Sequence, residues 1–152
     1  PSQSSAASDV YKRQGYESGL FLSGLELDPD LIREWKHKDP SQSSYRWTLE
    51  LFKNDNPPTA ILFQTEAVNG IFKGLDELNL QPGKDVALIG YDDLEIARIH
   101  RPSLSVLRPQ AREAGQRVVN ILMEVIKGED PGKFQEIHQV EMVIRETSLP
   151  PS

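Results

Sequence analysis

Two short, uninterrupted apolar runs separated by an amphipathic segment most constrain how this chain can fold. Residues 59–63 read TAILF and residues 86–89 read VALI. Strands that are apolar without alternation are typical of parallel sheets, in which helices cover both faces. The order strand, helix, strand predicts a βαβ unit, and therefore an α/β fold with a parallel sheet flanked by helices. The helix between the runs carries apolar residues at helical spacing: Val68, Ile71, Phe72, Leu75 and Leu78.

The flanking segments extend this pattern. Before the first run we expect a helix over 9–25, a short strand over 31–36 and a second helix that ends before 54–58, NDNPP. After the second run we expect a strand over 104–107, a long helix opened by Pro109, and a final strand over 137–144. The long helix carries an apolar stripe that is predicted to face inward: Val118, Ile121, Leu122 and Val125.

Composition argues against several classes of function. The chain has 152 residues, no cysteine and a formal net charge of −6. The missing cysteines remove disulfides, thiol nucleophiles, Fe–S clusters and thiolate zinc sites. A surface that binds nucleic acid needs clustered Lys and Arg, so the acidic balance argues against DNA contact by these residues. No apolar run approaches the roughly 18 residues of a membrane span, and we expect no membrane partner.

Polar residues follow both apolar runs directly. Gln64 and Thr65 follow the first run, and Asp92 and Asp93 lie just after the second. Because ligands bind α/β sheets beyond the carboxyl ends of the strands, Gln64 and Asp92 are predicted to converge on one ligand. A carboxylate accepts hydrogen bonds from vicinal hydroxyls, and an amide both donates and accepts, which suits a neutral polyol such as a sugar. The alternative, which the pattern alone favours, is that these side chains cap or begin the helices that follow them.

The sequence carries no pattern of a catalytic or metal site. His37, His100 and His138 lie far apart and have no metal-like partner at i+3 or i+4. The nucleophile elbow, the P-loop and the G-x-G-x-x-G motif are all missing. Near a strand end, the adjacent Asp92 and Asp93 should point in different directions rather than act as an acid–base pair. We therefore expect no enzyme activity, no catalytic residue, no metal and no cofactor.

A series of short motifs runs from residue 58 to the C-terminal end, and their order and spacing are specific. Together they resemble the C-terminal effector-binding core of bacterial LacI/GalR-family transcriptional regulators. Gly15-Tyr16 and Gly24-Leu25 extend the resemblance to nearly the whole chain. The motifs are PTAILF at 58–63, GIFKGL at 70–75, DVALIGYDD at 85–93, IAR at 96–98, PSLSV at 102–106 and VIRETS at 143–148.

This resemblance implies a type I periplasmic-binding-protein-like fold, in which two α/β subdomains hinge around a small effector. It implies that the chain is incomplete and holds mostly the C-terminal subdomain. Residues 15–152 would then form a partial sensor domain, and residues 1–14 a disordered leader or foreign sequence. The resemblance also implies a separate N-terminal helix-turn-helix headpiece, absent from this chain, that binds operator DNA as a dimer.

Residue roles follow from the same resemblance. Asp92 matches the aspartate with which the family hydrogen-bonds effector hydroxyls. Gln64 and Thr65 stand where the family usually has Asn-Asp, so they are assigned to the ligand site as well. The segment 94–101 and the helix over 68–78 match surfaces that commonly form the dimer contact. We therefore predict three interface residues: Ile71, Ile96 and Ile99.

The function implied is that of a cytoplasmic regulator. A small effector, expected to be a sugar or a related metabolite, would bind the sensor domain of a homodimer and alter operator binding allosterically. A sugar-binding protein of a periplasmic import system uses the same fold and is the alternative. An upstream helix-turn-helix would favour the regulator, whereas an upstream signal peptide would favour the import protein.

Overall fold

The computed structural model describes residues 3–34, 39–136 and 139–148, and its contacts divide the chain into two units, Pro1–Glu34 and Trp35–Ser152. The first unit holds helix α1 (Gln3–Leu22) and the 3-10 helix η1 (Pro29–Leu31). Helix α1 includes residues 3–14, where Gln, Ala, Lys and Arg are good helix formers even without an apolar stripe. That residues 1–14 are a disordered leader or foreign sequence stays a prediction. The strand predicted over 31–36 is not found at 31–34, and its last residues lie outside the described part.

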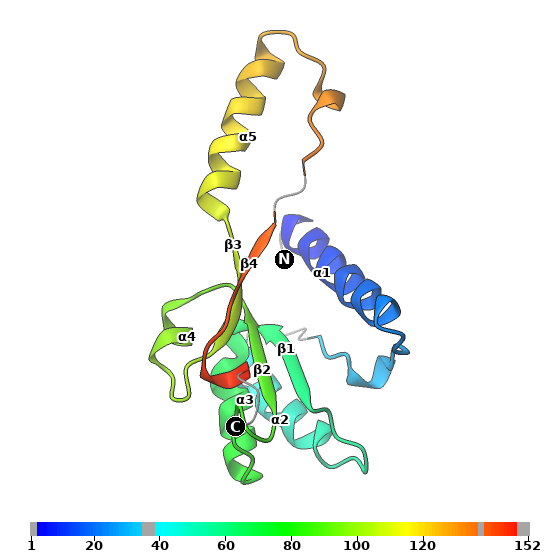
Figure 1. Ribbon diagram of the computed structural model, residues 1–152, viewed down its shortest axis with the longest axis vertical. Coiled ribbons are helices and arrows are strands. Elements are labelled where there is room, and N and C mark those ends of the chain that lie inside the picture. The colour runs from blue at the N-terminus through cyan, green and yellow to red at the C-terminus, as the bar shows by residue number, and fades with distance from the viewer. Residues whose placement is uncertain (1–2, 35–38, 137–138, 149–152) are drawn as a thin grey trace. The chain divides into compact units, whose positions relative to one another are not determined.

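The second unit contains one four-stranded sheet in the order β1-β2-β3-β4 (Figure 1). Strands β1, β2 and β3 run parallel, and β4 pairs antiparallel with β3. The predicted βαβ unit and parallel sheet are confirmed. In chain order the elements are α2 (Pro40–Leu51), β1 (Ala60–Gln64), η2 (Thr65–Ala67), α3 (Val68–Glu77), β2 (Ala87–Tyr91), α4 (Glu95–Ile99), β3 (Ser105–Pro109), α5 (Ala111–Ile126), η3 (Pro131–Lys133), β4 (Val140–Val143) and η4 (Glu146–Ser148).

Local residue chemistry explains where α2 and α3 begin and end. Asp39 caps α2, because its carboxylate accepts a hydrogen bond of 2.9 Å from the amide of Gln42. Pro40 follows at the first helical position, where its missing amide hydrogen costs nothing. After α3, Asn79 adopts a left-handed φ of 57°, which asparagine tolerates better than most residues, and the chain turns towards β2.

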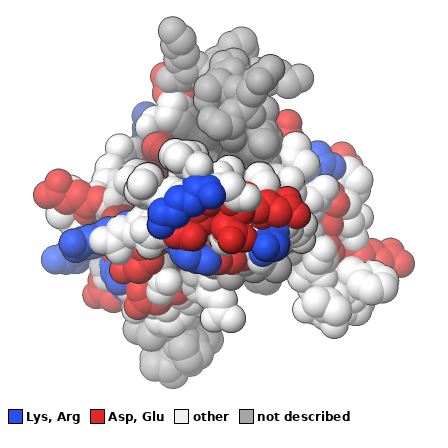
Figure 2. Space-filling model, turned by 90° about the horizontal axis from the view of Figure 1, so that it is seen from above, with Lys and Arg blue, Asp and Glu red and all other residues white. Residues whose placement is uncertain are grey.

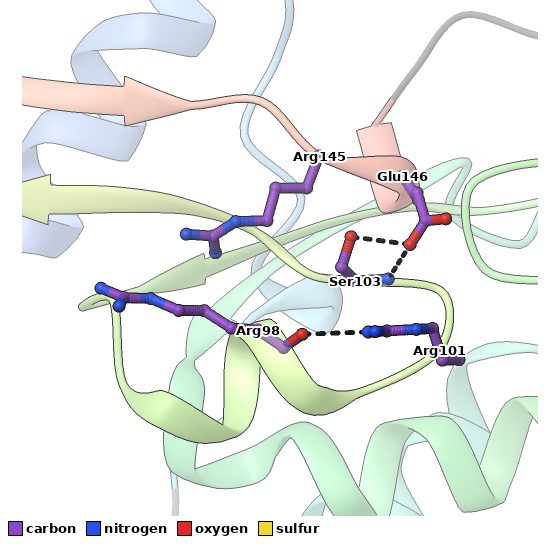
Figure 3. A pocket seen from close by; sticks show the side chains of 5 residues that line it. All are labelled: Arg98, Arg101, Ser103, Arg145 and Glu146. Carbon is purple, nitrogen blue, oxygen red and sulfur yellow. Dashed lines mark hydrogen bonds between the residues drawn. The ribbon is translucent and has the colours of Figure 1, made fainter.

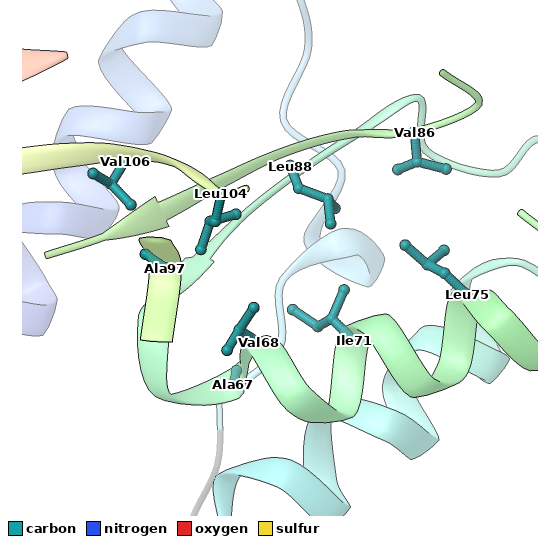
Figure 4. Close-up of a cluster of buried hydrophobic side chains, with 9 residues drawn as sticks. All are labelled: Ala67, Val68, Ile71, Leu75, Val86, Leu88, Ala97, Leu104 and Val106. Atoms are coloured by element: carbon teal, nitrogen blue, oxygen red, sulfur yellow. The ribbon is translucent and has the colours of Figure 1, made fainter. Parts of the chain in front are cut away.

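The core lies between α3 and one face of the sheet (Figure 4). Val68, Ile71 and Leu75 lie at three- and four-residue spacing on α3 and form one buried cluster with Leu88 of β2 and Val106 of β3. Ile71 is only 4% exposed. The side chain of Ile71 therefore packs in the core of this chain, and its contribution to a dimer interface stays a prediction.

Other apolar residues are left uncovered. Leu62 of β1 is 50% exposed, so the predicted burial of both sheet faces is not found at that strand. In α5 no residue is buried, although its stripe was predicted to face inward, because no other layer covers it among the described residues. Pro109 ends β3 rather than opening α5. The exposed apolar residues of α5 are Val118, Val119, Leu122, Met123 and Ile126.

Two glycines let α2 and α3 pack closely. A Cβ atom at Gly70 would overlap the carbonyl oxygen of Ser41 and the hydroxyl of Ser44. At Gly74, a Cβ atom would lie 2.8 Å from the Cβ of Thr48, which is buried in α2. The carbonyl oxygen of Ser41 belongs to the backbone, so it cannot move away from Gly70 without shifting the start of α2.

In the full-length protein, we expect Gly70→Ala to lower the free energy of unfolding by about 1–3 kcal/mol, the usual cost of overpacking. Denaturant unfolding measures the change, and Asp76→Ala, at an exposed position of the same helix, is the matched control. The control should stay within about 0.5 kcal/mol of the unaltered protein. Equal stability of the two variants would contradict the close packing of α2 on α3.

Residues 145–148 form hydrogen bonds to strands β2 and β3 of the sheet. Thr147 is fully buried; it donates a hydrogen bond of 2.8 Å to the carbonyl of Leu88 and accepts one of 2.9 Å from the amide of Ser105. The hydroxyl of Ser105 in turn accepts from the amide of Arg145 at 2.8 Å. The motif at 143–148 thus has a structural role at β2 and β3. Across the described residues, no helix combines the length and the apolarity that a membrane span requires.

Candidate functional site

The sheet register brings the predicted site residues to one edge. Gln64, the last residue of β1, pairs with Tyr91, the last residue of β2, and Asp92 follows directly. The predicted juxtaposition of the two strand ends is therefore found in the backbone. Such an edge is where ligands bind to parallel α/β sheets.

Asp92 occupies an unusual backbone conformation at this edge. Its φ is 78°, in the left-handed region, and its amide donates a hydrogen bond of 2.9 Å to the carbonyl of Leu107 in β3. Left-handed conformations are costly for residues other than glycine, and they concentrate at functional sites where the surrounding structure enforces them. The side chain is half-buried, so it borders both protein and solvent.

Thr65 enforces that conformation from the neighbouring strand end. It is fully buried, and its hydroxyl lies 2.7 Å from the carbonyl oxygens of both Tyr91 and Asp92, to which it donates. A side chain at Gly90 would collide with the same hydroxyl. The geometry gives Thr65 a positioning role at the turn, because its hydroxyl is buried against these two carbonyls. Direct ligand contact by Thr65 stays a prediction.

The alternative is found at Gln64 and Thr65, where η2 begins, but not at Asp92 and Asp93. The N-cap of α4 is Leu94, and the N-cap of η2 is Gln64; neither makes a side-chain capping hydrogen bond. Neither Asp92 nor Asp93 caps α4. Thr65 is the first residue of η2, as the alternative expected. Gln64 is half-buried, and its side-chain amide makes no capping hydrogen bond to η2.

Asp93 is the centre of a cluster of ion pairs that the sequence did not reveal. Its side chain is 4% exposed. Oδ2 accepts from Arg98 Nη2 at 2.8 Å and from Arg108 Nη2 at 2.5 Å, and Oδ1 accepts from Arg145 Nη2 at 2.8 Å. The three arginines lie 5, 15 and 52 residues after Asp93 in the sequence, so no local motif predicts the cluster.

The ionisation of Asp93 follows from these partners. Burial alone would raise the pKa of the carboxyl, but hydrogen bonds from Arg98, Arg108 and Arg145 outweigh it and hold the pKa well below its usual range. Asp93 is therefore ionised at neutral pH and serves as the common acceptor of the three arginines.

In the full-length protein, Asp93→Asn is expected to lower the melting temperature at pH 7 by about 6 °C or more, because it removes the charge of a buried carboxylate that accepts hydrogen bonds from three arginines. The folded pKa lies below the unfolded value of 3.8, so the stabilisation is complete above about pH 4 and is lost as the pH falls further. The difference in melting temperature between variant and unaltered protein should therefore shrink from pH 4 to pH 2. A difference that stayed constant over this range would contradict the assignment. Glu141→Gln, which removes an exposed partner of Arg108, is the control.

Charged side chains of both signs are mixed on the face that Figure 2 displays, where Lys and Arg lie beside Asp and Glu. An open surface pocket of about 480 Å³ is lined mostly by charged side chains (Figure 3). In this pocket, Glu146 accepts hydrogen bonds of 2.6 Å from the backbone amide of Ser103 and 2.7 Å from its hydroxyl. The hydrogen bond from the backbone amide is the main cause that lowers the pKa of Glu146. Neither Asp92 nor Gln64 lines this pocket, so it is separate from the predicted site. Its lining residues are Arg98, Arg101, Ser103, Arg145 and Glu146.

The described histidine has a structural environment. His100 Nε2 lies 2.9 Å from Asn69 Oδ1, and its ring centroid is 4.5 Å from that of Phe72. Burial lowers the pKa of His100. His37 and His138 lie outside the described residues, within which no group of His, Asp and Glu is arranged to hold a metal ion.

Comparison with known proteins covers nearly the whole chain. Residues 6–148 match the model of the periplasmic binding protein-like domain family. The chain belongs to this family. The match covers residues 35–148 of the α/β unit that carries Asp92 and residues 6–34 of the N-terminal unit.

Within this family, the similar proteins are transcriptional regulators of the LacI type, as the sequence motifs indicated. The HTH-type transcriptional repressor PurR of Histophilus somni is 26% identical over 141 residues, which cover 91% of this chain and 41% of the repressor. The lactose operon repressor of Escherichia coli is 27% identical over 135 residues, covering 87% and 36%. The chain thus spans about two fifths of the length of these curated relatives, which are named as repressors and not as enzymes.

Solved structures of this periplasmic binding protein-like family agree. A regulatory protein of the LacI family from Chloroflexus aggregans matches with a TM-score of 0.77 and 25% identity, over 89% of this chain and 48% of that one. The Lac repressor dimer bound to operator and the anti-inducer ONPF matches with a TM-score of 0.63 and 26% identity, over 72% and 38%. The predicted resemblance and α/β fold class are therefore confirmed.

Proposed function

We propose that the chain is the effector-sensing part of a LacI-type transcriptional regulator, which binds a small neutral polyol, such as a sugar, at the carboxyl ends of β1 and β2. The observation that carries the proposal is the turn at Asp92. Its left-handed backbone is held by Thr65 and Leu107, and its carboxylate follows the strand paired with the one that Gln64 ends. A carboxylate beside an amide supplies the acceptors and donors that vicinal hydroxyls need.

In this proposal the sensor is no enzyme and needs no cofactor. It works in the cytoplasm as a homodimer, and operator DNA is bound by a helix-turn-helix headpiece outside these residues. The similarity to proteins named as repressors supports a regulator over the alternative, a periplasmic sugar-binding protein. Below, the full-length regulator means these residues together with that headpiece and the first subdomain.

Calorimetry on the full-length regulator tests the ligand class. The panel holds neutral sugars, namely glucose, galactose, ribose, maltose and sucrose, with adenine and uracil as planar ligands that lack vicinal hydroxyls. We expect saturable binding of at least one sugar and none of the two bases. Binding of a base without any sugar would overturn the polyol assignment.

The homodimer proposal rests on α4. Ile99 is 65% exposed, whereas Ile96 is half-buried against the core, so Ile99 is the stronger candidate for an interface contact. We expect Ile99→Glu to raise the dimer dissociation constant at least about tenfold, because a charge would replace an apolar contact. Analytical ultracentrifugation measures it, with Glu95→Gln in the same helix as the control. An unchanged dimer would remove Ile99 from the interface.

A further inference from the structure

We propose that Asp93 is a positioning residue that couples the turn at Asp92 to strands β3 and β4, so that effector binding at the turn is transmitted to both strands. This inference rests on the proposed function, because it concerns how occupancy of that site is relayed. Its basis is the buried carboxylate of Asp93, which holds three arginines from three different elements.

The first half of the connection lies at the turn. Asp93 follows Asp92 directly, and the amide of Asp92 donates to the carbonyl of Leu107 in β3. The next residue of β3 is Arg108, whose Nε and Nη2 both donate to Asp93 Oδ2, at 3.0 and 2.5 Å. The turn is therefore joined to two consecutive residues of β3, through the backbone at one and through side chains at the other.

The second half lies where the chain leaves the sheet and returns to it. Arg108 is the penultimate residue of β3, which ends at Pro109, and α5 begins at Ala111. Arg145 lies two residues after β4 ends and donates to Asp93 Oδ1 and to the carbonyl of Leu104. One carboxylate thus contacts strand β3 and the segment directly after β4, and α5 lies between these two in the sequence.

The charges make this connection rigid. Asp93 carries one negative charge against three guanidinium groups, and only Arg108 has a second carboxylate partner, Glu141 at 3.0 Å, among the described residues. Ion pairs that are shielded from solvent are screened less than exposed pairs. A displacement of Asp93 would therefore leave Arg108 and Arg145 close together without the carboxylate between them. Movement of the turn and movement of the two strands are coupled for this reason.

The test is made in the full-length regulator with the sugar that binds in the calorimetric panel and an operator selected from random-sequence DNA. Two quantities are measured for each variant: the dissociation constant of the sugar, and the ratio of operator affinities with and without saturating sugar. We expect Asp93→Asn to bring that ratio to within about twofold of one, because the variant loses most of the coupling of about fivefold or more that is expected of the unaltered protein. Glu141→Gln, which removes the other carboxylate on Arg108, should leave the ratio within about twofold.

A second pair of variants decides the matter if Asp93→Asn does not fold. Arg108→Gln removes the ion pair between Asp93 and β3. Arg98→Gln removes the ion pair between Asp93 and α4, in which the side chain of Arg98 is 59% exposed. We expect Arg108→Gln to lower the operator ratio at saturating sugar, and Arg98→Gln to leave it nearly unchanged. Equal effects of the two, or no effect of either, would overturn the inference. An unaltered protein that binds no panel sugar refutes the proposed function itself, a result distinct from these.

Discussion

Asp92→Ala is expected to abolish the response to effector while leaving operator binding intact. The carboxylate of Asp92 can accept two hydrogen bonds from vicinal hydroxyls, and hydrogen bonds to a charged group contribute about 1.5–3 kcal/mol each. Their loss should weaken effector binding by about a hundredfold or more. Operator binding should survive, because the proposed function places the headpiece outside these residues and the core cluster does not include Asp92.

Two further substitutions separate the carboxylate from the backbone strain. Asp92 has a φ of 78°, which alanine adopts at a cost, so Asp92→Ala alone could act through the turn. Asp92→Gly keeps the turn without strain and removes the side chain, whereas Asp92→Asn keeps a polar side chain that tolerates the conformation. We expect Asp92→Gly to lose effector binding as fully as Asp92→Ala, and Asp92→Asn to retain part of it. Calorimetry that found normal affinity in Asp92→Gly would exclude the carboxylate as a ligand contact.

The second large effect concerns the 152-residue chain on its own, which we expect to self-associate or to melt without a sharp cooperative transition. Five apolar residues of α5 are exposed, at 49–69% of their surface. Covering an apolar side chain contributes about 1.5–3 kcal/mol, so this uncovered face is comparable to the net stability of a domain. Size-exclusion chromatography with light scattering and a calorimetric melt measure the outcome.

Polar substitutions on the same face test the cause. Val118, Leu122 and Ile126 recur at four-residue spacing on α5, and changing all three to Gln should reduce self-association of the isolated chain. The same changes should destabilise the full-length regulator, in which we expect the first subdomain to cover this face. A sharp, reversible melt of the unaltered chain as a monomer would show that α5 needs no cover.

The elements that could be predicted from the sequence are those with strong local signals. The uninterrupted apolar runs gave β1 and β2, and the 3.6-residue period of Val68, Ile71 and Leu75 gave α3. The same period places Ile71 beside Val68 and Leu75, so its burial was readable from the pattern, and only the family resemblance led it to be assigned to an interface. The strand predicted over 31–36 failed because a few apolar residues beside Pro29 are equally compatible with a short 3-10 helix.

The parts that could not be predicted depend on partners far along the chain. Thr65 reaches carbonyls 26 and 27 residues away, and Asp93 reaches Arg145 across 52 residues, so neither hydrogen bond has a local signature. The presence of helix α5 was predicted correctly. Burial of its apolar stripe depends on the elements packed around it and not on the spacing of its apolar residues. The edge at Gln64 and Asp92 was predictable because parallel strands necessarily end on the same side of the sheet.

Operator affinity of the full-length regulator, measured with and without a saturating concentration of the panel sugar that binds it, tests the central claim most directly. The account predicts a change of at least about fivefold, the lower end of typical allosteric coupling, that disappears in Asp92→Ala. Operator affinity that stays the same although calorimetry shows the sugar bound would contradict the claim that these residues sense an effector for a regulator.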